Sequence, residues 1–485
     1  MPQLAADVGT RKQPASSYSP PLIGDHKRQT WAWLLLRELD DKDDPGSQES
    51  STVPVSKSES GSDDDDLSDG PDITPQQPIL DAEKWFITEQ KITSSRGGVP
   101  RTDLSVYTTG NAVTSYTATN EFYNAIYDDL STTKEGDRVM LATWLSALAP
   151  LKPDVDTTGS KTGFKEVFTG VVERGGNVDI LGWASIAGGY MPYNFKARNA
   201  INSIPPSPIN GARALYIFDD HINLIASHHQ KTLVIAANTS AGRHYQPVAY
   251  VGGIDLVIDR WDTMYHNNTA IRDAGNITYI NKGWVDGHLR IHGPAAKYVA
   301  NNFVARWNSD YLPCRGLDDE LLDFENPSYE DIPSLDYGSS NTTASPGSTL
   351  CYIYKADRKL LIHTKLVIID DVYLSIGSAN WNRRSMTADP ELNADVVDGD
   401  TVVSPEGLTM GKLPRDFRIR KFQEMTGLSY EKLGDMTFVE AADQFKLAAM
   451  DESTLLANLE IECHAYFVAI IDTIRKVSDP EFTCY

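Results

Sequence analysis

Short apolar runs rich in β-branched residues recur along the chain, and stretches with apolar residues three or four positions apart separate several of them. Runs of the first kind are typical of buried strands, and the second spacing is typical of helices that bury one face. The predicted strands are 138–145, 178–183, 214–218, 232–235, 249–252, 350–355, 360–369 and 372–376, and the predicted helices are 121–130, 294–307 and most of 413–477. This alternation predicts an α/β fold.

The distribution of polar residues divides the chain into four parts. Residues 1–78 carry few apolar residues and many Pro, Ser and Asp, so they cannot bury enough surface to offset their ordering entropy, and we expect disorder there. Residues 315–348 are acidic and rich in Ser, Gly, Pro and Asn, which predicts a flexible loop between two folded parts. The folded parts are then 79–314 and 349–485.

Composition and charge narrow the class of protein. The chain has 485 residues, of which 41% are hydrophobic and 23% charged, a globular balance. A net charge of -23 opposes binding to nucleic acid, which relies on Lys and Arg to displace condensed counterions. No window approaches the run of about 20 apolar residues that a transmembrane helix needs. We expect a cytoplasmic or peripheral membrane protein, with secretion left open.

Two segments contain the same chemical groups and suggest two halves of one site. Each has a His and a Lys two positions apart, and a Gly-containing turn with an Asp or Asn follows: His229, Lys231 and Gly252-Gly-Ile-Asp255 in one, and His363, Lys365, Asp370 and Gly377-Ser378-Ala-Asn380 in the other. Residues two apart on a strand share a face, so each His–Lys pair could serve one ligand. A nucleophilic imidazole, a proton-donating imidazole and a cationic cradle for phosphate would need both segments.

The second segment fits a known signature at every defined position. In H-x-K-x(4)-D-x(6)-G-S-x-N, the defined residues are His363, Lys365, Asp370, Gly377, Ser378 and Asn380. With its partial first copy, the chain resembles the phospholipase D superfamily. The flanking segments 252–262, 284–294, 302–308 and 378–386 are similar to the eukaryotic and plant-like branch.

This resemblance implies a fold and a set of roles. Family members have two similar α/β lobes around one shared active site, and they act through a phosphohistidine intermediate. The resemblance makes His229 the nucleophile and His363 the acid, and it lets Lys231 and Lys365 stabilise the phosphoryl oxygens. It also counts the signature residue Asp370 among the catalytic groups. It assigns hydrogen bonding to substrate to Ser378 and Asn380. The resemblance also assigns the carboxylate that is hydrogen-bonded to the far nitrogen of each imidazole: Asp255 in the first half and Glu391 in the second.

The resemblance further implies the partners. The expected substrate is a glycerophospholipid at a membrane surface, with a choline-type headgroup, cleaved to phosphatidic acid and free headgroup or transferred to a primary alcohol. We expect a monomer that uses no metal or other cofactor and binds no nucleic acid.

The first segment departs from the signature at one position. Ala236 stands where the second segment has Asp370. Two alternatives to an active lipase therefore stay open: a catalytically weakened relative that binds phospholipid without turnover, and a nuclease of the same superfamily. At this stage, whether the chain is an enzyme depends on the consequence of Ala236.

Overall fold

The computed structural model describes residues 75–456 with internal gaps at 96, 101–106, 185–190, 220–226, 237–246, 268, 275–282, 310–328, 334, 336–359, 382–384, 386–388 and 452. The expected disorder of 1–78, the strand at 350–355 and the helical pattern beyond residue 456 therefore fall largely or wholly outside the described residues. Most of the expected loop at 315–348 does so too.

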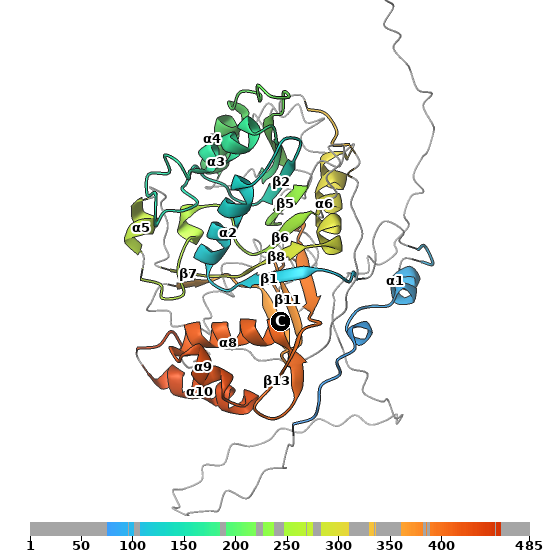
Figure 1. Ribbon diagram of the computed structural model, residues 1–485, viewed down its shortest axis with the longest axis vertical. Coiled ribbons are helices and arrows are strands. Elements are labelled where there is room, and N and C mark those ends of the chain that lie inside the picture. Colours follow the sequence, from blue (N-terminus) through green and yellow to red (C-terminus); the bar gives the residue numbers. More distant parts are fainter. Residues whose placement is uncertain are drawn as a thin grey trace, which may run out of the picture. The chain divides into compact units, whose positions relative to one another are not determined.

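The first half of the chain builds a seven-stranded mixed sheet (Figure 1). Its order is β1-β8-β6-β5-β2-β3-β4, in which β2, β3 and β4 run parallel and the remaining neighbours are antiparallel. The strands are β1 (Ala112–Tyr116), β2 (Arg138–Thr143), β3 (Asn177–Trp183), β4 (Ala214–Asp219), β5 (Thr232–Ala236), β6 (Val248–Gly252) and β8 (His288–His292). The predicted strands at 138–145, 178–183, 214–218, 232–235 and 249–252 are confirmed, with ends shifted by a few residues.

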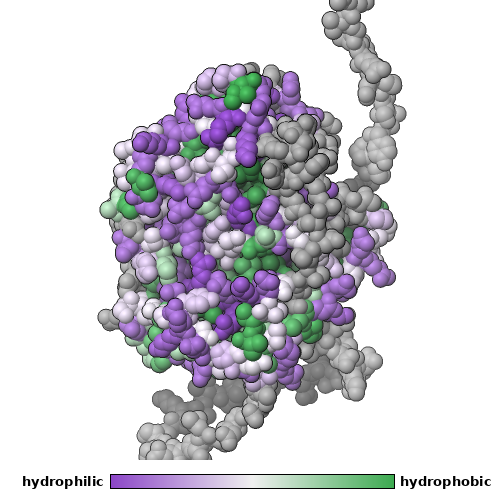
Figure 2. All heavy atoms as spheres, in the orientation of Figure 1, coloured by the Kyte–Doolittle hydropathy of each residue, from purple (hydrophilic) through white to green (hydrophobic). Residues whose placement is uncertain are grey.

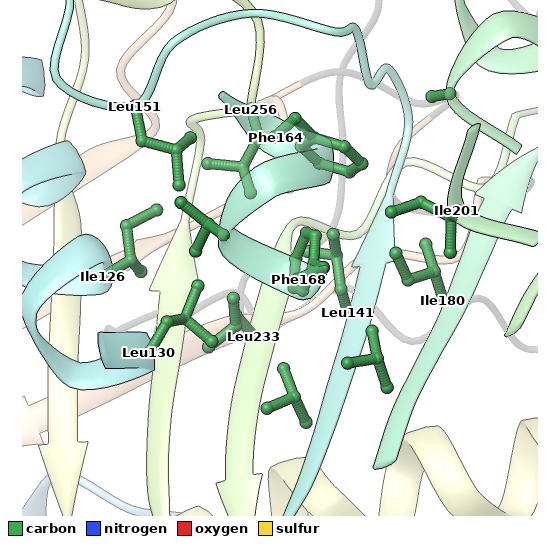
Figure 3. Packing of buried hydrophobic residues seen from close by; sticks show 14 of the residues in the cluster. Ile126, Leu130, Leu141, Leu151, Phe164, Phe168, Ile180, Ile201, Leu233 and Leu256 are labelled. Atoms are coloured by element: carbon green, nitrogen blue, oxygen red, sulfur yellow. The ribbon is translucent and has the colours of Figure 1, made fainter. Parts of the chain in front are cut away.

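Helices cover one face of this sheet. They are α2 (Thr119–Ser131), α3 (Phe164–Glu173) and α4 (Met191–Asn202), and α2 contains the helix predicted at 121–130. Their buried side chains, including Ile126, Phe168 and Ile201, pack against Leu141 and Ile180 of the strands (Figure 3). The apolar residues of α2 recur three or four positions apart because that spacing places them on one face of a helix.

The opposite face of the sheet is covered by α6 (Pro294–Trp307) and by elements of the second half of the chain. Here β10 (Leu366–Ile369), β11 (Tyr373–Gly377) and β12 (Asn393–Val397) form a three-stranded antiparallel sheet. Leu374 and Ile376 of this sheet share one apolar cluster with Val234 and Leu289 of the large sheet. The mixed α/β class is confirmed, and the two motif strands β5 and β10 belong to two sheets that share this apolar cluster.

The second half differs from the prediction in one place. The expected strand 360–369 is broken into β9 (Leu360–Ile362) and β10, and the motif residues 363–365 lie between them; β9 pairs in parallel with β7 (Gly283–Val285). The stretch expected to be mostly helical begins with α8 (Lys412–Thr426), α9 (Tyr430–Gly434) and α10 (Phe438–Met450), as predicted. Helix α8 ends at Gly427, whose φ of 73° stops the helix.

The remaining described elements are peripheral to the site. They are η1 (Ala82–Lys84), α1 (Glu89–Ser95), η3 (Ile258–Arg260), α5 (Thr269–Ala274), β13 (Thr401–Val403) and β14 (Thr409–Gly411). Figure 2 shows a mainly hydrophilic face with separate small apolar areas. In the described part of the chain, every helix is too short or too polar to cross a bilayer.

The signature residue Asp370 lies in the turn between β10 and β11. Asp370 and Asp371 have φ of 48° and 60°, and the Val372 amide donates to the Ile369 carbonyl at 3.1 Å. Two consecutive residues with positive φ are characteristic of the tight hairpin turn whose twist matches its strands. Asp tolerates this conformation better than most residues, which explains its presence in the turn.

This turn predicts a difference between two variants that both lack the Asp370 carboxylate. Asp370→Val places a β-branched residue at φ 48°, whereas Asp370→Gly accepts that φ freely. The Val variant should be less stable than the Gly variant by about 1–2 kcal/mol in urea unfolding. Equal stabilities would show that the carboxylate, and not the backbone conformation, is the reason for Asp at this position.

Candidate active site

The two motif histidines face each other. Their ring centroids are 6.1 Å apart and the rings are inclined by 68°. The side chains of His229 and His363 remain 12% and 20% exposed, so both are accessible from solvent. The prediction that the two segments meet at one place is therefore matched by the geometry.

His229 is held by the second half of the chain. Its Nδ1 lies 2.9 Å from both carboxylate oxygens of Glu391 and 3.1 Å from the carbonyl oxygen of Ser378. The carbonyl can only accept, so Nδ1 carries the proton and Nε2 keeps its lone pair. The His229 amide also donates to the Pro390 carbonyl at 3.1 Å, which pins the motif to the residue just before its carboxylate.

His363 is held by the first half in the same way. Its Nδ1 donates to Asp286 Oδ2 at 2.7 Å, and its amide donates to the Val285 carbonyl at 2.9 Å. Val285 immediately precedes Asp286, as Pro390 precedes Glu391. Each motif thus binds a two-residue unit of the opposite half through one main-chain and one side-chain hydrogen bond.

The predicted pairing of carboxylates with imidazoles was wrong. Glu391 had been assigned to the second half's own histidine, but it contacts His229, and the partner of His363 is Asp286. Asp255 contacts neither ring through a described hydrogen bond. Each imidazole meets a carboxylate of the other half of the chain. A carboxylate chosen because it follows the histidine in the sequence is therefore the wrong partner.

Asp255 instead organises the end of β2 beneath the site. Its Oδ1 accepts from Thr143 Oγ1 at 3.0 Å and from the amides of Trp144 and Leu145 at 3.1 and 3.0 Å. Its Oδ2 lies 3.7 Å from Lys231 Nζ. Asp255 therefore acts on the site through Lys231 and the 143–145 backbone.

The lysines brace their own motifs. Lys231 Nζ donates to the His229 carbonyl at 2.7 Å, and Lys365 Nζ donates to the His363 carbonyl. This contact accounts for the two-residue spacing, because the ammonium reaches back to the histidine backbone. An ammonium has three donors, so each lysine keeps donors for an anion.

Burial and neighbouring charges set the protonation states. Burial, Lys231 and His363 together hold the pKa of His229 well below its usual value, so the ring is neutral near pH 7. Burial also lowers the pKa of His363, but here the Asp286 carboxylate acts in the opposite direction. Burial opposes ionisation of Asp286, yet His363 and Lys365 hold the pKa of that carboxyl below its usual range.

The carboxylate behind His229 is different. Burial raises the pKa of Glu391 to about 7, although Lys231 acts to lower it. Asp286 thus stays ionised at neutral pH while Glu391 is poised to share a proton. The ionised Asp286 favours the protonated form of His363, whereas Glu391 favours the protonated form of His229 less strongly. His363 is therefore better suited to donate a proton, and His229 to act as a nucleophile.

Two predicted ligand-binding residues have different surroundings. Ser378 is fully buried, and its hydroxyl accepts from the Leu392 amide at 3.0 Å. The sequence assigned it to substrate, which stays a prediction; in the structure its hydroxyl also lies in hydrogen-bonding contact with Glu391, and this contact acts to lower the pKa of that carboxyl. Asn380 is half-buried, with Nδ2 donating to Ser385 Oγ at 3.3 Å, and its role at the substrate stays a prediction.

Asp370 and Ala236 lie away from the imidazoles. Each is five positions beyond its motif lysine on an extended segment, which corresponds to about 16 Å at the rise of a β-strand. Ala236 is 2% exposed within the apolar cluster between the sheets. The signature Asp is thus a turn residue in the second half, and its replacement by Ala236 removes nothing from the reacting groups.

Sequence reasoning missed Asp286 and the tryptophans beside the rings. Trp284 lies 5.1 Å from the His363 ring, and Trp144 lies 6.0 Å from the His229 ring. The segment 284–290 had been noted only as a flanking similarity. The available signal was the spacing of Trp284, Asp286 and His288 at alternate positions where β7 passes into β8, since buried carboxylates need a cationic or hydrogen-bonding partner.

The arrangement brings together two imidazoles with different carboxylate partners and two ammonium groups. Among the described residues, no cluster of three His, Cys, Asp or Glu side chains has the geometry to hold a metal ion.

Comparison with known proteins agrees with the site. Residues 209–345 match the family described as Phospholipase D, and residues 324–404 match Cardiolipin synthase, PLD-like domain. These ranges contain the first and second motif respectively. Phospholipase D gamma 3 of Arabidopsis thaliana is 30% identical over 161 residues, and Phospholipase D beta 2 of the same plant is 34% identical over 134 residues.

These similarities are partial. The two alignments cover 29% and 23% of this chain, and only 18% and 14% of the plant proteins. Phospholipase D alpha 2 of Oryza sativa is 27% identical over 261 residues, 49% of this chain and 28% of that protein. Among solved structures, phosphatidylserine synthase of Haemophilus influenzae aligns over 70% of this chain and 93% of its own, at 11% identity and a TM-score of 0.34.

The buried lysines predict a pH-dependent affinity for anions. Burial lowers the pKa of Lys365 to about 8, so its charge is present below pH 8 and is lost above it. Sulfate keeps its charge over this range, and its binding should weaken roughly tenfold between pH 7 and pH 9. Tryptophan fluorescence titration, which exploits Trp144 and Trp284, would measure the change.

Lys365→Arg is the matched control, because guanidinium stays charged over the whole range. Its sulfate affinity should be much flatter with pH. A wild-type affinity that does not change from pH 7 to pH 9 would contradict the assignment of Lys365 as an anion ligand.

Proposed function

Because the chain belongs to the phospholipase D superfamily, we propose that it is a phosphodiesterase that hydrolyses glycerophospholipids to phosphatidic acid and free headgroup. The observation that carries this proposal is the pair of opposed imidazoles, each backed by a carboxylate from the other half of the chain. One imidazole can attack phosphorus while the other protonates the leaving group only if both lie on one phosphate.

In the first step His229 Nε2 attacks the phosphorus. A phosphorus–nitrogen bond forms, the bond to the headgroup oxygen breaks, and that oxygen takes the proton from His363 Nε2. The neutral state of His229 favours attack, and the ionised Asp286 favours a protonated His363. Lys231 and Lys365 stabilise the charge on the phosphoryl oxygens.

In the second step the roles reverse. His363, now neutral, takes a proton from water, the water oxygen bonds to phosphorus, and the phosphorus–nitrogen bond breaks with its electron pair returning to His229. A primary alcohol in place of water would give a transferred phosphatidyl group. Division into two displacements replaces one difficult step with two easier ones.

The lipid substrate is supported by two features. Relatives of this chain are named phospholipases D, and a net charge of -23 disfavours a polyanionic nucleic acid. A zwitterionic phosphatidylcholine surface at a membrane avoids the repulsion that a strongly anionic one would cause. Phosphatidylcholine is therefore the first substrate to test.

A catalytically weakened phospholipid-binding protein is the second candidate. The argument for this candidate was that Ala236 replaces the signature Asp. Ala236 lies in the apolar cluster, five positions along the strand from Lys231, so this replacement is a weak argument against turnover. The complete set of His229, Lys231, His363 and Lys365 favours turnover.

Release of choline from phosphatidylcholine vesicles tests the proposal. The wild type should release choline, His229→Asn should release none above background, and His363→Asn should be slower by about 10²–10⁴-fold. Wild-type release no faster than that of the two variants would refute hydrolysis of this lipid.

Rapid acid-free quenching with a labelled phosphatidyl group distinguishes the two histidines. Label should stay covalently bound to wild type and to His363→Asn, and never to His229→Asn. Label on His229→Asn would reverse the assignment of nucleophile and acid.

Restoration of the signature residue in the first segment tests the role of Ala236. Ala236→Asp puts a carboxylate five positions, or about 16 Å along the extended segment, from Lys231, which is beyond hydrogen-bonding distance of the reacting groups. The rate per folded molecule should change by less than about threefold, while urea unfolding reports the cost of burying the carboxylate. A rate increase of tenfold or more would show that Ala236 limits catalysis.

A further inference from the structure

A third histidine, outside the reacting pair, is clamped between two carboxylates. His266 Nδ1 lies 2.8 Å from Asp262 Oδ2, and its Nε2 lies 3.1 Å from Glu424 Oε1. The His266 side chain is only 4% exposed. Asp262 belongs to the first half of the chain and Glu424 to helix α8, so the ring joins two segments that are far apart in sequence.

The ring must be charged to satisfy both contacts. Ionised carboxylates can only accept, so each ring nitrogen has to donate, and only imidazolium has two N–H groups. Burial acts to lower the pKa of His266, but the hydrogen bonds to Asp262 and Glu424 outweigh it and raise the pKa to about 9. Lys421 lies on the far side of Glu424, with Nζ 2.8 Å from Oε2, so two cations balance two carboxylates.

These contacts continue to the segment 284–286, whose Asp286 binds His363. Asp262 Oδ2 accepts from the Trp284 amide at 2.8 Å, and Lys421 Nζ donates to the Asp286 carbonyl at 3.1 Å. The segment 284–286 is therefore held at its first residue by Asp262 and at its last by Lys421. His266 links these two anchors through Glu424.

The held segment is what orients the acid imidazole. Asp286 Oδ2 accepts from His363 Nδ1, and the Trp284 ring lies 5.1 Å from the His363 ring. Trp284 Nε1 also donates to Asp286 Oδ2 at 3.2 Å, which fixes the carboxylate. A shift of the 284–286 backbone would therefore move His363 relative to the phosphate.

We propose that His266 is a positioning residue, whose imidazolium joins Asp262 to Glu424 and thereby keeps His363 aligned to protonate the leaving group. The catalytic part of this inference rests on the proposed function. The link between the two segments does not, and it can be tested by stability alone.

The effect on stability has a definite sign. The pKa of His266 is raised in the folded protein, so its contribution is fully present below the unfolded value of about 6.5 and is lost as the pH rises through about 9. Asp262, Glu424 and Lys421 are the charged groups that face or flank the ring. Deprotonation leaves two carboxylates against one cation in a buried place.

His266→Asn is the informative variant. Asn adopts the φ of 51° found at this position more readily than most residues, so the backbone is kept while the charge and one of the two contacts are removed. His292→Asn is the matched control, because His292 is an exposed imidazole at the end of β8.

The first measurement is the thermal midpoint from pH 6 to pH 10. The wild-type midpoint should exceed that of His266→Asn by several degrees near pH 7, and the two should converge as the pH approaches 10. The difference between the proteins cancels the titration of other groups, such as Lys365. His292→Asn should follow the wild type throughout. A constant difference over the whole range would overturn the charged clamp.

The second measurement compares two leaving groups at a temperature where both proteins are folded. With phosphatidylcholine, whose choline alkoxide needs a proton, His266→Asn should lower kcat about tenfold with little change in KM. With a p-nitrophenyl phosphodiester, whose leaving group departs without a proton, the loss should be less than about twofold. An equal loss with both substrates would overturn the positioning role.

Glu424→Gln serves if His266→Asn does not fold. It keeps the shape of the side chain and removes one carboxylate, so the pH-dependent part of the midpoint should shrink and the defect should again depend on the leaving group. If the wild type cleaves neither substrate, the proposed function fails, and the positioning claim fails with it. The clamp itself is then still judged by the pH dependence of the midpoint.

Discussion

The active site depends on two crossed hydrogen bonds between an imidazole and a carboxylate. His229 binds Glu391, and His363 binds Asp286, and in both pairs the partners come from opposite halves of the chain. Neither half could hold its histidine alone, because the ring nitrogen away from the phosphate would then lack a partner in a mostly buried place. Assembly of the halves and formation of the site are therefore one event, and the apolar cluster shared by the two sheets drives it.

The buried charges around the phosphate position balance one another. Lys231 lies beside Asp255, and Lys365 lies in the field of Asp286, so each ammonium is partly compensated before an anion arrives. If the carboxylates fully balanced the ammonium charge, no positive charge would be left to attract a phosphodiester. If they did not balance it at all, burial of the ammonium would cost too much free energy. The lowered pKa values of both lysines reflect this compromise.

Much of the layout could be predicted from the sequence, because it depends on local pattern. Apolar runs located β2 to β6, and the repeated His-x-Lys identified the four groups that meet. The strand β8 escaped notice because the polar residues His288, Arg290 and His292 alternate with its buried Leu and Ile, so no apolar run marks the strand. The break after β9 was missed for a related reason, since apolar residues continue on both sides of His363.

The partners of the imidazoles could not be predicted from local pattern. Which carboxylate meets which ring depends on how two halves approach, and the nearest candidate in sequence was the wrong one in both cases. The signature Asp shows the opposite error, in which a position defined by a motif was taken for a reacting group. The positive φ of Asp370 shows that the hairpin turn needs a residue that tolerates this backbone conformation. A sequence motif can therefore contain residues that the turn requires as well as residues that the chemistry requires.

The two halves give the histidines different chemistry even though the hydrogen bonds match. Asp286 accepts from His363, from Trp284 and from the Gly287 amide, so its charge is well solvated by donors. Glu391 has hydrogen bonds from His229 and from the side chains of Ser378 and Ser385, yet burial still raises its pKa to about 7. The two carboxylates thus differ in the balance between burial and nearby cations: His363 and Lys365 outweigh burial at Asp286, whereas Lys231 does not outweigh it at Glu391. The environment, rather than the residue type, sets the protonation of each imidazole–carboxylate pair.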